Sequence, residues 1–208
     1  MDLKKLLTDG ARELGVPLSA GQTGAFMVYL SELRKWNRKT NLTAIEDPKE
    51  IVVKHFLDSL SLIKILPDGA KTAADIGSGA GFPGIPLKIA VPGLSITSVE
   101  PAHKKAAFQR HIIRLLGIEG IRVVEAKVEE VAAGPGRFDI ILSRAFKDPE
   151  GLLPLAGPLL SEGGQVILSL GPSVGEEPPA GWGIARRDGV TLPFSDIKRN
   201  LVSYVKAG

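Results

Sequence analysis

One short segment, Asp75–Gly84 (sequence DIGSGAGFPG), carries residues whose types and spacing could do chemistry. A short apolar run ends in Asp75, glycines then alternate at Gly77, Gly79 and Gly81, and a run typical of a helix follows. This order predicts a strand, a tight turn and the start of a helix. Such a turn brings bare backbone N–H groups close to a bound nucleotide-like cofactor.

The glycine spacing fits two classes of cofactor. Residues 79–84 match the G-x-G-x-x-G fingerprint of dinucleotide-binding proteins, whereas residues 75–81 match the D-x-G-x-G-x-G pattern of methyltransferases that use S-adenosylmethionine (SAM). A carboxylate at Asp75 would repel a pyrophosphate and attract the ammonium and sulfonium groups of SAM. Electrostatics therefore favours SAM. Dinucleotide binding and a plain glycine turn capped by Asp75 are the alternatives.

A second acidic residue follows where a cofactor site would need one. Residues 94–100 alternate apolar and polar side chains, which predicts the second strand of a βαβ unit ending at Glu100. A carboxylate there can accept hydrogen bonds from ribose hydroxyls, whichever cofactor is bound. The alternative is a solvated carboxylate at the end of a strand.

The pattern of apolar residues divides the chain in two. Residues 1–68 have the period of helices, with a polar loop expected over 37–47, and form a predicted N-terminal helical segment packed on the catalytic domain. Residues 69–208 alternate strands with helices, which predicts a mostly parallel sheet with helices on both faces. The expected strands are 72–77, 95–100, 121–126, 138–143, 164–170, 183–187 and 201–205, and the expected helices among them are 83–90, 103–116 and 148–160.

A Pro/Gly-containing stretch, and no helix, separates the last two of these strands, so they should pair as an antiparallel hairpin at the sheet edge. The fold class is therefore α/β. A Rossmann-like, mostly parallel seven-stranded sheet with an antiparallel terminal hairpin is the architecture of the class I SAM-dependent methyltransferases. Here an N-terminal helical extension precedes it.

Composition excludes several chemistries. The chain has 208 residues, 44% of them hydrophobic and 24% charged, which is ordinary for a globular protein. Without cysteine it has no disulfide, no thiolate metal site and no nucleophile for methylation at carbon 5 of a pyrimidine. Its three histidines are too scattered for a metal site. No run resembles a secretory signal or a membrane span, so we expect a cytoplasmic protein with no membrane and no metal partner.

The charge distribution is compatible with a nucleic-acid partner. The net charge is +3, and Arg34, Lys35, Arg38 and Lys39 cluster around Trp36. On a helix, positions 34/38 and 35/39 form two adjacent rows that can follow a line of phosphates. The alternative is a solvated helix end, with Trp36 packed in the core.

Several segments together resemble a known family. They are WNRKTNLT at 36–43, HFLDSL at 55–60, the glycine segment continued to Leu87, and FDIILSRAF at 138–146. In order and spacing they resemble the bacterial 16S ribosomal RNA guanine-N7 methyltransferases, the RsmG (GidB) family. The resemblance spans nearly the whole chain. It implies a SAM-dependent enzyme that methylates N7 of one guanine in 16S rRNA, within the small ribosomal subunit or an assembly intermediate.

The resemblance also implies site residues. The SAM contacts of the family fall on Gly77, Phe82, Val128, Glu129 and Arg144, which join Asp75, Gly79 and Glu100 as the predicted cofactor-binding set. An ion pair of Arg144 with Asp75 or Glu100 is the alternative role for that arginine. Two positions depart from the family pattern: Glu100 stands where many relatives have Asp, and Ser169 precedes Leu170-Gly171 where a lysine is frequent.

No catalytic residue is predicted, because guanine N7 has an available lone pair and needs no general base before it attacks a methyl group held in line. The candidate substrate contacts are polar residues between apolar helical faces, although helix capping and core packing would explain several of them equally well. They are Arg38, Asn41, His55, Asp58, Ser59 and Lys147.

Two other functions compete with methyl transfer. An NAD-dependent oxidoreductase would share the fold, but the only tyrosines, Tyr29 and Tyr204, are predicted to lie outside the cofactor loops. A non-catalytic ribosome-binding factor would bind RNA without turnover, and the intact glycine pattern disfavours it. We expect the enzyme to act as a monomer.

Overall fold

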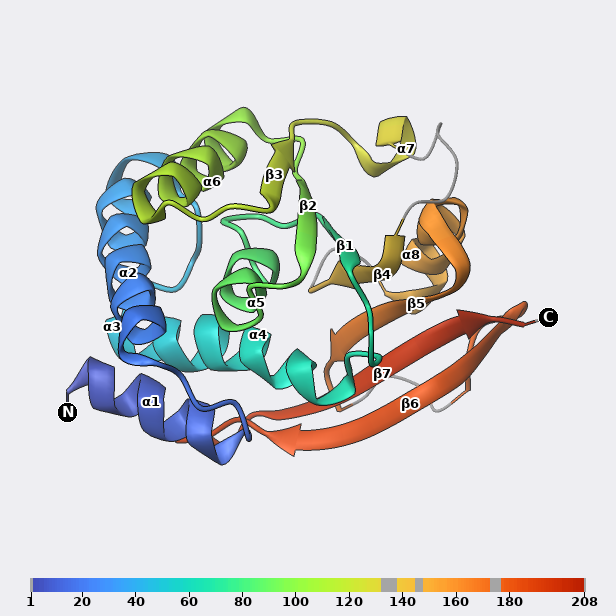
Figure 1. Ribbon diagram of the computed structural model, residues 1–208, viewed down its shortest axis with the longest axis horizontal. Helices are drawn as coiled ribbons and strands as arrows, with labels where there is room; N and C mark the ends of the chain where they lie inside the picture. Colours follow the sequence, from blue (N-terminus) through green and yellow to red (C-terminus); the bar gives the residue numbers. More distant parts are fainter. Residues whose placement is uncertain (1, 132–137, 145–147, 173–176, 208) are drawn as a thin grey trace.

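A computed structural model describes residues 2–131, 138–144, 148–172 and 177–207. The described strands form one seven-stranded sheet in the order β3-β2-β1-β4-β5-β7-β6 (Figure 1). The first five strands pair in parallel, and β6 and β7 add antiparallel at the edge. The strands are β1 (Thr72–Ile76), β2 (Ser95–Val99), β3 (Ile121–Val124), β4 (Phe138–Ser143), β5 (Leu160–Leu170), β6 (Trp182–Thr191) and β7 (Lys198–Lys206).

The predicted α/β class and the terminal hairpin are thus confirmed. Between the parallel strands lie α5 (Gly84–Ala90), α6 (His103–Leu116), α7 (Val128–Val131) and α8 (Pro149–Ala156), and a 3-10 turn, η3 (Gly157–Leu159), follows α8. The helix predicted over 148–160 is therefore too long. Pro158 lies in the 3-10 turn, and β5 begins four residues earlier than predicted because it pairs with Phe138 before a bulge.

Residues 3–65 are largely helical, as predicted. The elements are α1 (Leu3–Glu13), α2 (Ala20–Thr40), α3 (Pro48–Ile51), the π-helical η1 (Val52–Leu57), α4 (Asp58–Ser61) and the 3-10 turn η2 (Leu62–Ile65). A capping box between Ser19 and Gln22 begins α2. The loop predicted from residue 37 is wrong in its first part. The helix continues to Thr40 and ends only where Asn41 adopts a left-handed conformation (φ 49°).

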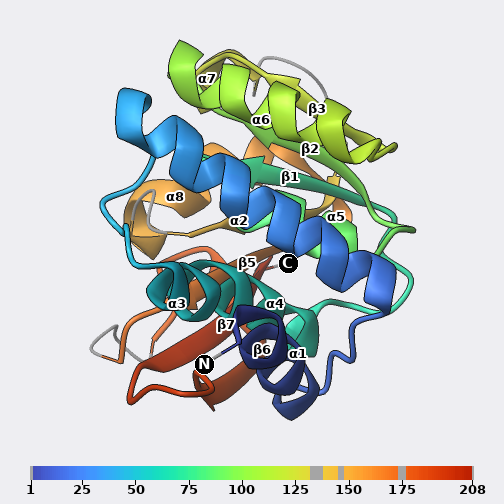
Figure 2. The ribbon, with the colours of Figure 1, turned by 90° about the vertical axis from the view of Figure 1, so that its left-hand side faces the viewer.

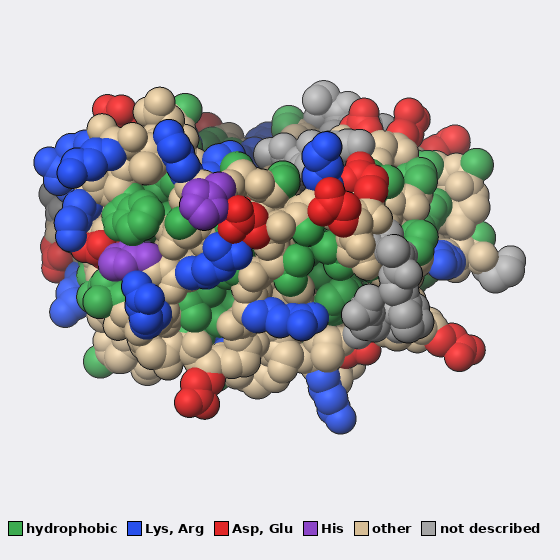
Figure 3. Space-filling model, turned by 90° about the horizontal axis from the view of Figure 1, so that it is seen from above, with side chains coloured by type: hydrophobic (Ala, Val, Ile, Leu, Met, Phe, Trp, Pro, Cys, Tyr) green, Lys and Arg blue, Asp and Glu red, His purple; other side chains and the backbone are tan. Residues whose placement is uncertain are grey.

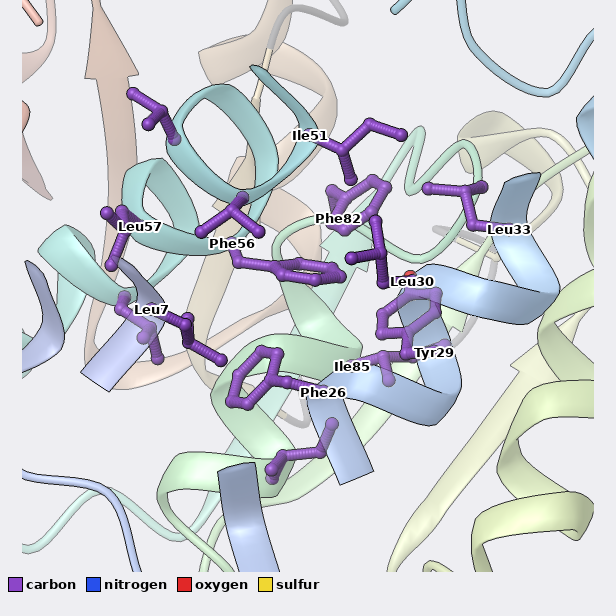
Figure 4. Close-up of a cluster of buried hydrophobic side chains, with 14 of the residues drawn as sticks. Leu7, Phe26, Tyr29, Leu30, Leu33, Ile51, Phe56, Leu57, Phe82 and Ile85 are labelled. Carbon is purple, nitrogen blue, oxygen red and sulfur yellow. The ribbon is translucent and has the colours of Figure 1, made fainter. Parts of the chain in front are cut away.

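The helical segment and the sheet share a core. Figure 2 shows α2 lying across the molecule beside α5 and α6, with α1 and α3 below it. The aromatic rings of Phe26, Tyr29, Phe56 and Phe82 contact one another in this core, with ring centroids 5.0–6.0 Å apart (Figure 4). Trp36 is half-buried and packs on Phe108 with a centroid distance of 5.6 Å. This packing fixes the helical segment against the loop that follows β1.

Alternation along the strands separates the two faces of the sheet. Ala73 and Ile140 belong to the cluster that contains Leu87 of α5, whereas Ala74 and Ile141 belong to the cluster that packs α8. Both faces of β1 and β4 are therefore covered, which is usual for parallel strands. The loops at the carboxyl ends of these strands are left to form a site.

Candidate active site

The glycine loop after β1 has the geometry that its sequence predicts. Gly77, Gly79 and Gly81 all have positive φ, at 66°, 60° and 99°. A Cβ atom at Gly81 would also lie 2.9 Å from the Tyr29 hydroxyl, and one at Gly84 would lie 2.7 Å from Asp75 Oδ2. Side chains therefore cannot replace these hydrogens without displacing neighbours.

Asp75 is fully buried beneath this loop. Its Oδ2 accepts a hydrogen bond from the Gly84 N–H at 2.7 Å, while Oδ1 has no hydrogen-bond partner among the described residues. Burial raises the pKa of the Asp75 carboxyl from 3.8 to about 7, against the opposing effects of the Gly84 hydrogen bond and the charge of Arg144. A buried carboxyl with one unpaired oxygen fits a site for a cationic ligand, and it fits a pyrophosphate poorly.

Glu100 braces the same loop. Its Oε2 accepts from the Gly79 N–H at 2.8 Å and its Oε1 from the Ala102 N–H at 2.9 Å. The side chain is only 5% exposed, so the alternative of a solvated strand-end carboxylate is wrong. Each oxygen keeps a lone pair that a ribose hydroxyl can use.

Gln109 on α6 also holds the glycine loop in place, and the sequence did not predict it. Its Nε2 donates to Ser78 Oγ at 2.7 Å and to the Gly79 carbonyl at 2.8 Å. A glutamine in a helix gives no signal in a single sequence. Only the packing of α6 beside the loop reveals its role.

A cavity of about 350 Å³ opens beside the glycine loop, where β1, β2 and β3 end. We call it the β1–β3 cavity. It brings together three predicted cofactor residues, since Gly77, Val128 and Glu129 all line it. The remaining lining residues are Ile76, Val99, Pro101, Ala126 and Lys127. An apolar slot with a few polar groups at its edge suits a nucleoside.

Phe82 and Tyr29 connect the loop to the helical segment. The two rings stack at 5.3 Å, and the Tyr29 hydroxyl donates to the Ala80 carbonyl at 2.5 Å. Tyr29 lies on α2 and therefore outside the cofactor loops, as predicted, but α2 brings its side chain into contact with the loop that follows β1. The hydroxyl is buried and already engaged, and burial raises its pKa well above 10. It offers no free acid for hydride chemistry.

Arg144, directly after β4, joins three groups of the helical segment. It donates to the Lys54 carbonyl at 2.6 Å, to His55 Nδ1 at 2.7 Å and to Asp58 Oδ2 at 3.4 Å. Its guanidinium also lies 5.3 Å from the centre of the Phe82 ring. Among the described residues, Arg144 forms its ion pair with Asp58, so the alternative prediction of an ion pair with Asp75 or Glu100 is wrong.

This arrangement fixes the state of His55. A guanidinium can only donate, so Nδ1 must accept and the proton resides on Nε2, which donates to Thr43 Oγ1 at 2.8 Å. Burial, followed by the charge of Arg144, lowers the pKa of His55 from 6.5 to about 3. His55 is therefore neutral at physiological pH and orients Arg144.

A second arginine, Arg199 at the start of β7, was not predicted. It donates to both carboxylate oxygens of Asp58 at 3.1 Å, and Ser169 donates to Oδ1 at 3.1 Å. Asp58 is 2% exposed and is shared by two guanidinium groups. Arg199 is distant in sequence, and only the antiparallel return of β7 beside β5 places it here.

These cations line a larger cavity of about 490 Å³ at the ends of β4 and β5, which we call the β4–β5 cavity. Three cations, Lys54, Arg144 and Arg199, line it together with Asp58 and Asp148, and Lys54 also pairs with Glu50 at 2.7 Å. The other lining residues are Ile45, His55, Pro149, Ser169, Leu170 and Gly171. Because β1 lies between β2 and β4, the two cavities flank the loop that follows β1.

The structure brings only some of the predicted substrate contacts to this cavity. His55 and Asp58 line it, whereas Ser59 is fully buried and donates to the His55 carbonyl at 2.6 Å. Arg38 and Asn41 are exposed near the end of α2, outside the cavity, and Asn41 ends that helix. Lys147 lies outside the described residues.

Comparison with known proteins identifies the family. Residues 22–179 match the family GidB, rRNA small subunit methyltransferase G. A ribosomal RNA small subunit methyltransferase G from Geotalea uraniireducens (strain Rf4) is 45% identical over 212 residues, covering 98% of this chain and 96% of that protein. One from Burkholderia pseudomallei (strain 668) is 41% identical, covering 96% and 90%. The chain belongs to this family. It is a SAM-dependent rRNA methyltransferase, so the oxidoreductase and the non-catalytic factor are set aside.

Solved structures agree on the fold. MtNAS, solved as a mutant in complex with S-adenosylmethionine, aligns with a TM-score of 0.58 at 19% identity, covering 99% of this chain and 88% of that one. Precorrin-6y C5,15-methyltransferase from Geobacter metallireducens GS-15 aligns at 0.54 and 16% identity, covering 73% and 87%. Within the described part of the chain, no helix is long and apolar enough to cross a membrane, and no group of three or more His, Asp or Glu side chains could hold a metal ion.

Proposed function

We propose that this enzyme transfers the methyl group of SAM to N7 of one guanine in 16S rRNA, acting as a monomer in the cytoplasm on the small ribosomal subunit or an assembly intermediate. The observation that carries the proposal is the pair of cavities on either side of the glycine loop. One has the size and lining of a nucleoside site, and the other is lined by the guanidinium groups of Arg144 and Arg199.

The β1–β3 cavity is the proposed place for the adenosine of SAM. Val128 and Glu129 would contact the adenine, and Glu100 would accept from the ribose. Asp75, buried with an unpaired oxygen, would favour the cationic end of the cofactor. SAM supplies an electrophilic methyl group on a sulfonium.

The β4–β5 cavity is the proposed place for the target nucleotide. Arg144 and Arg199 give it a positive wall suited to a phosphate or to the carbonyl oxygen of guanine. Neutral His55 cannot take up a proton near pH 7, and N7 needs no base. The contribution of the protein to catalysis is therefore to position the reactants. Asp58 holds both arginines, and the stacked rings of Phe82 and Tyr29 hold the loop between the cavities.

The proposal is tested with radiolabelled SAM and purified ribosomal subunits from cells that lack this enzyme. We expect label in small-subunit RNA and none in large-subunit RNA. Arg199→Lys keeps the charge but loses the two-pronged pairing with Asp58, so it should lower transfer while SAM binding stays unchanged. Label in large-subunit RNA, or in protein, would overturn the proposed acceptor.

A further inference from the structure

A third hollow lies beside the β4–β5 cavity, between the C-terminal half of α2 and the chain that leads into α3. We call it the α2 groove. It has a volume of about 380 Å³ and is lined by Ser31, Arg34, Lys35, Asn37, Arg38, Ile45, Glu46 and Ile51. In Figure 2 the backbone elements that carry these residues lie near one another, with the end of α2 above α3 and the connecting loop at their side.

Hydrogen bonds hold one wall of the groove in place. Asn37 is buried, and its side-chain oxygen accepts from the Thr43 N–H at 2.9 Å, which ties the connecting loop to α2. Thr43 in turn accepts from the Ile45 N–H at 3.2 Å and contacts His55. The loop that forms one side of the groove is thus fixed to the residue that orients Arg144.

The groove carries unneutralised positive charge. Arg34 and Arg38 are exposed, one helical turn apart, and neither has an ion-pair or hydrogen-bond partner for its side chain among the described residues. Lys35 pairs with Glu32 at 3.3 Å, and Glu46 is the single acidic side chain in the lining. Figure 3 shows Lys and Arg side chains gathered at this end of the molecule, over α2 and α6. Two free guanidinium groups in a row match successive phosphates of a nucleic-acid strand.

The groove adjoins the proposed target site. Ile45 lines both the α2 groove and the β4–β5 cavity, so the two hollows are neighbours that share a wall. The α2 groove contributes Arg34 and Arg38, and the adjoining cavity contributes Lys54, which pairs with Glu50 at 2.7 Å, and Arg144, which pairs with Asp58 at 3.4 Å.

We propose that the α2 groove holds the RNA backbone next to the target nucleotide. Phosphates of one flanking segment lie on Arg34 and Arg38, while the target base enters the β4–β5 cavity past Ile45. This inference rests on the proposed function, and it adds the path by which the substrate strand reaches the site. Arg34 and Arg38 are positioning residues, since they touch neither the reacting base nor SAM.

The test uses a double variant that carries both Arg34→Ala and Arg38→Ala. Its matched control is a second double variant, Arg186→Ala and Lys206→Ala, which removes two exposed cations from the β6–β7 hairpin. Methyl transfer and filter binding of small-subunit particles are measured at about 50 and 200 mM salt. Two phosphate contacts account for about a tenfold rise in KM and Kd over this range. The α2 variant should lose that part of the salt dependence and should bind particles about tenfold more weakly at low salt.

The same variant should keep the wild-type kcat, SAM affinity and melting temperature, because its side chains are exposed and outside both cavities. Arg34→Lys with Arg38→Lys should restore most of the binding. Equal KM and salt dependence in the α2 variant and the hairpin control would overturn the inference, as would a loss confined to kcat. Failure of the proposed function has a different signature: the wild type would bind particles without methylating them, and the filter-binding comparison would still decide the role of the groove.

Discussion

Replacing Asp75 by asparagine isolates the buried carboxyl at the centre of the site. The pKa of Asp75 is raised from 3.8 to about 7, so between these values the folded protein holds a proton that the unfolded chain releases. The free energy of unfolding must then fall as pH rises through this window. From pH 5 to pH 8 the change attributable to Asp75 is about 3 kcal/mol, at about 1.4 kcal/mol per unit. An asparagine side chain does not titrate, keeps an oxygen for the Gly84 N–H and abolishes this change.

The assay is urea unfolding of both proteins at several pH values without SAM. Between pH 5 and pH 8 the free energy of unfolding of Asp75→Asn should rise by about 3 kcal/mol relative to that of the wild type. Asp139→Asn is the matched control. The backbone N–H groups of Lys71 and Thr72 hold the pKa of Asp139 below 3.8. The loss in free energy of unfolding caused by Asp139→Asn should therefore be the same at every pH in this range. Parallel profiles for wild type and Asp75→Asn would show that the pKa of Asp75 is not raised in the folded protein. SAM affinity gives a second readout: it should rise with pH between about 5.5 and 7 in the wild type and stay flat and weaker in the variant.

The contacts around the site support three further predictions. Tyr29→Phe leaves the buried Ala80 carbonyl without its donor, so it should lower the free energy of unfolding by about 1–2 kcal/mol. It should also weaken SAM binding measured by calorimetry, and unchanged SAM affinity would contradict the link between Tyr29 and the glycine loop. Asp58→Ala leaves two guanidinium groups without their carboxylate and should cost about 3–5 kcal/mol in urea unfolding, against about 1 kcal/mol for the neighbouring Ser59→Ala. His55 should stay neutral, with its proton on Nε2, down to about pH 4 in nitrogen-detected NMR, and a midpoint near its ordinary 6.5 would contradict the Arg144 contact.

The sheet and the cofactor loop could be predicted because their signals are local. The acid at the end of β1, the alternating glycines and Glu100 each follow a strand whose apolar pattern is clear, and parallel topology then brings the strand ends together. The terminal hairpin was predictable for a similar reason, because a turn-rich stretch replaces a helix between the last two strands.

The polar network of the β4–β5 cavity could not be predicted, because it joins residues far apart in the chain. Asp58, Arg144, Ser169 and Arg199 come from four separate segments, and only the packed fold shows that one carboxylate serves two arginines. Tyr29 illustrates the same limit, because nothing in the local sequence indicates that its hydroxyl reaches the glycine loop.

Specificity for guanine N7 is decided by mapping the labelled base after transfer from SAM to small subunits that lack the modification. Borohydride reduction followed by aniline cleaves RNA at N7-methylguanosine, so the position and the methylated atom are read together. We expect a single enzyme-dependent cleavage in 16S rRNA that accounts for all the label. Label on an exocyclic amine, a ribose or a pyrimidine, without such cleavage, would contradict this specificity.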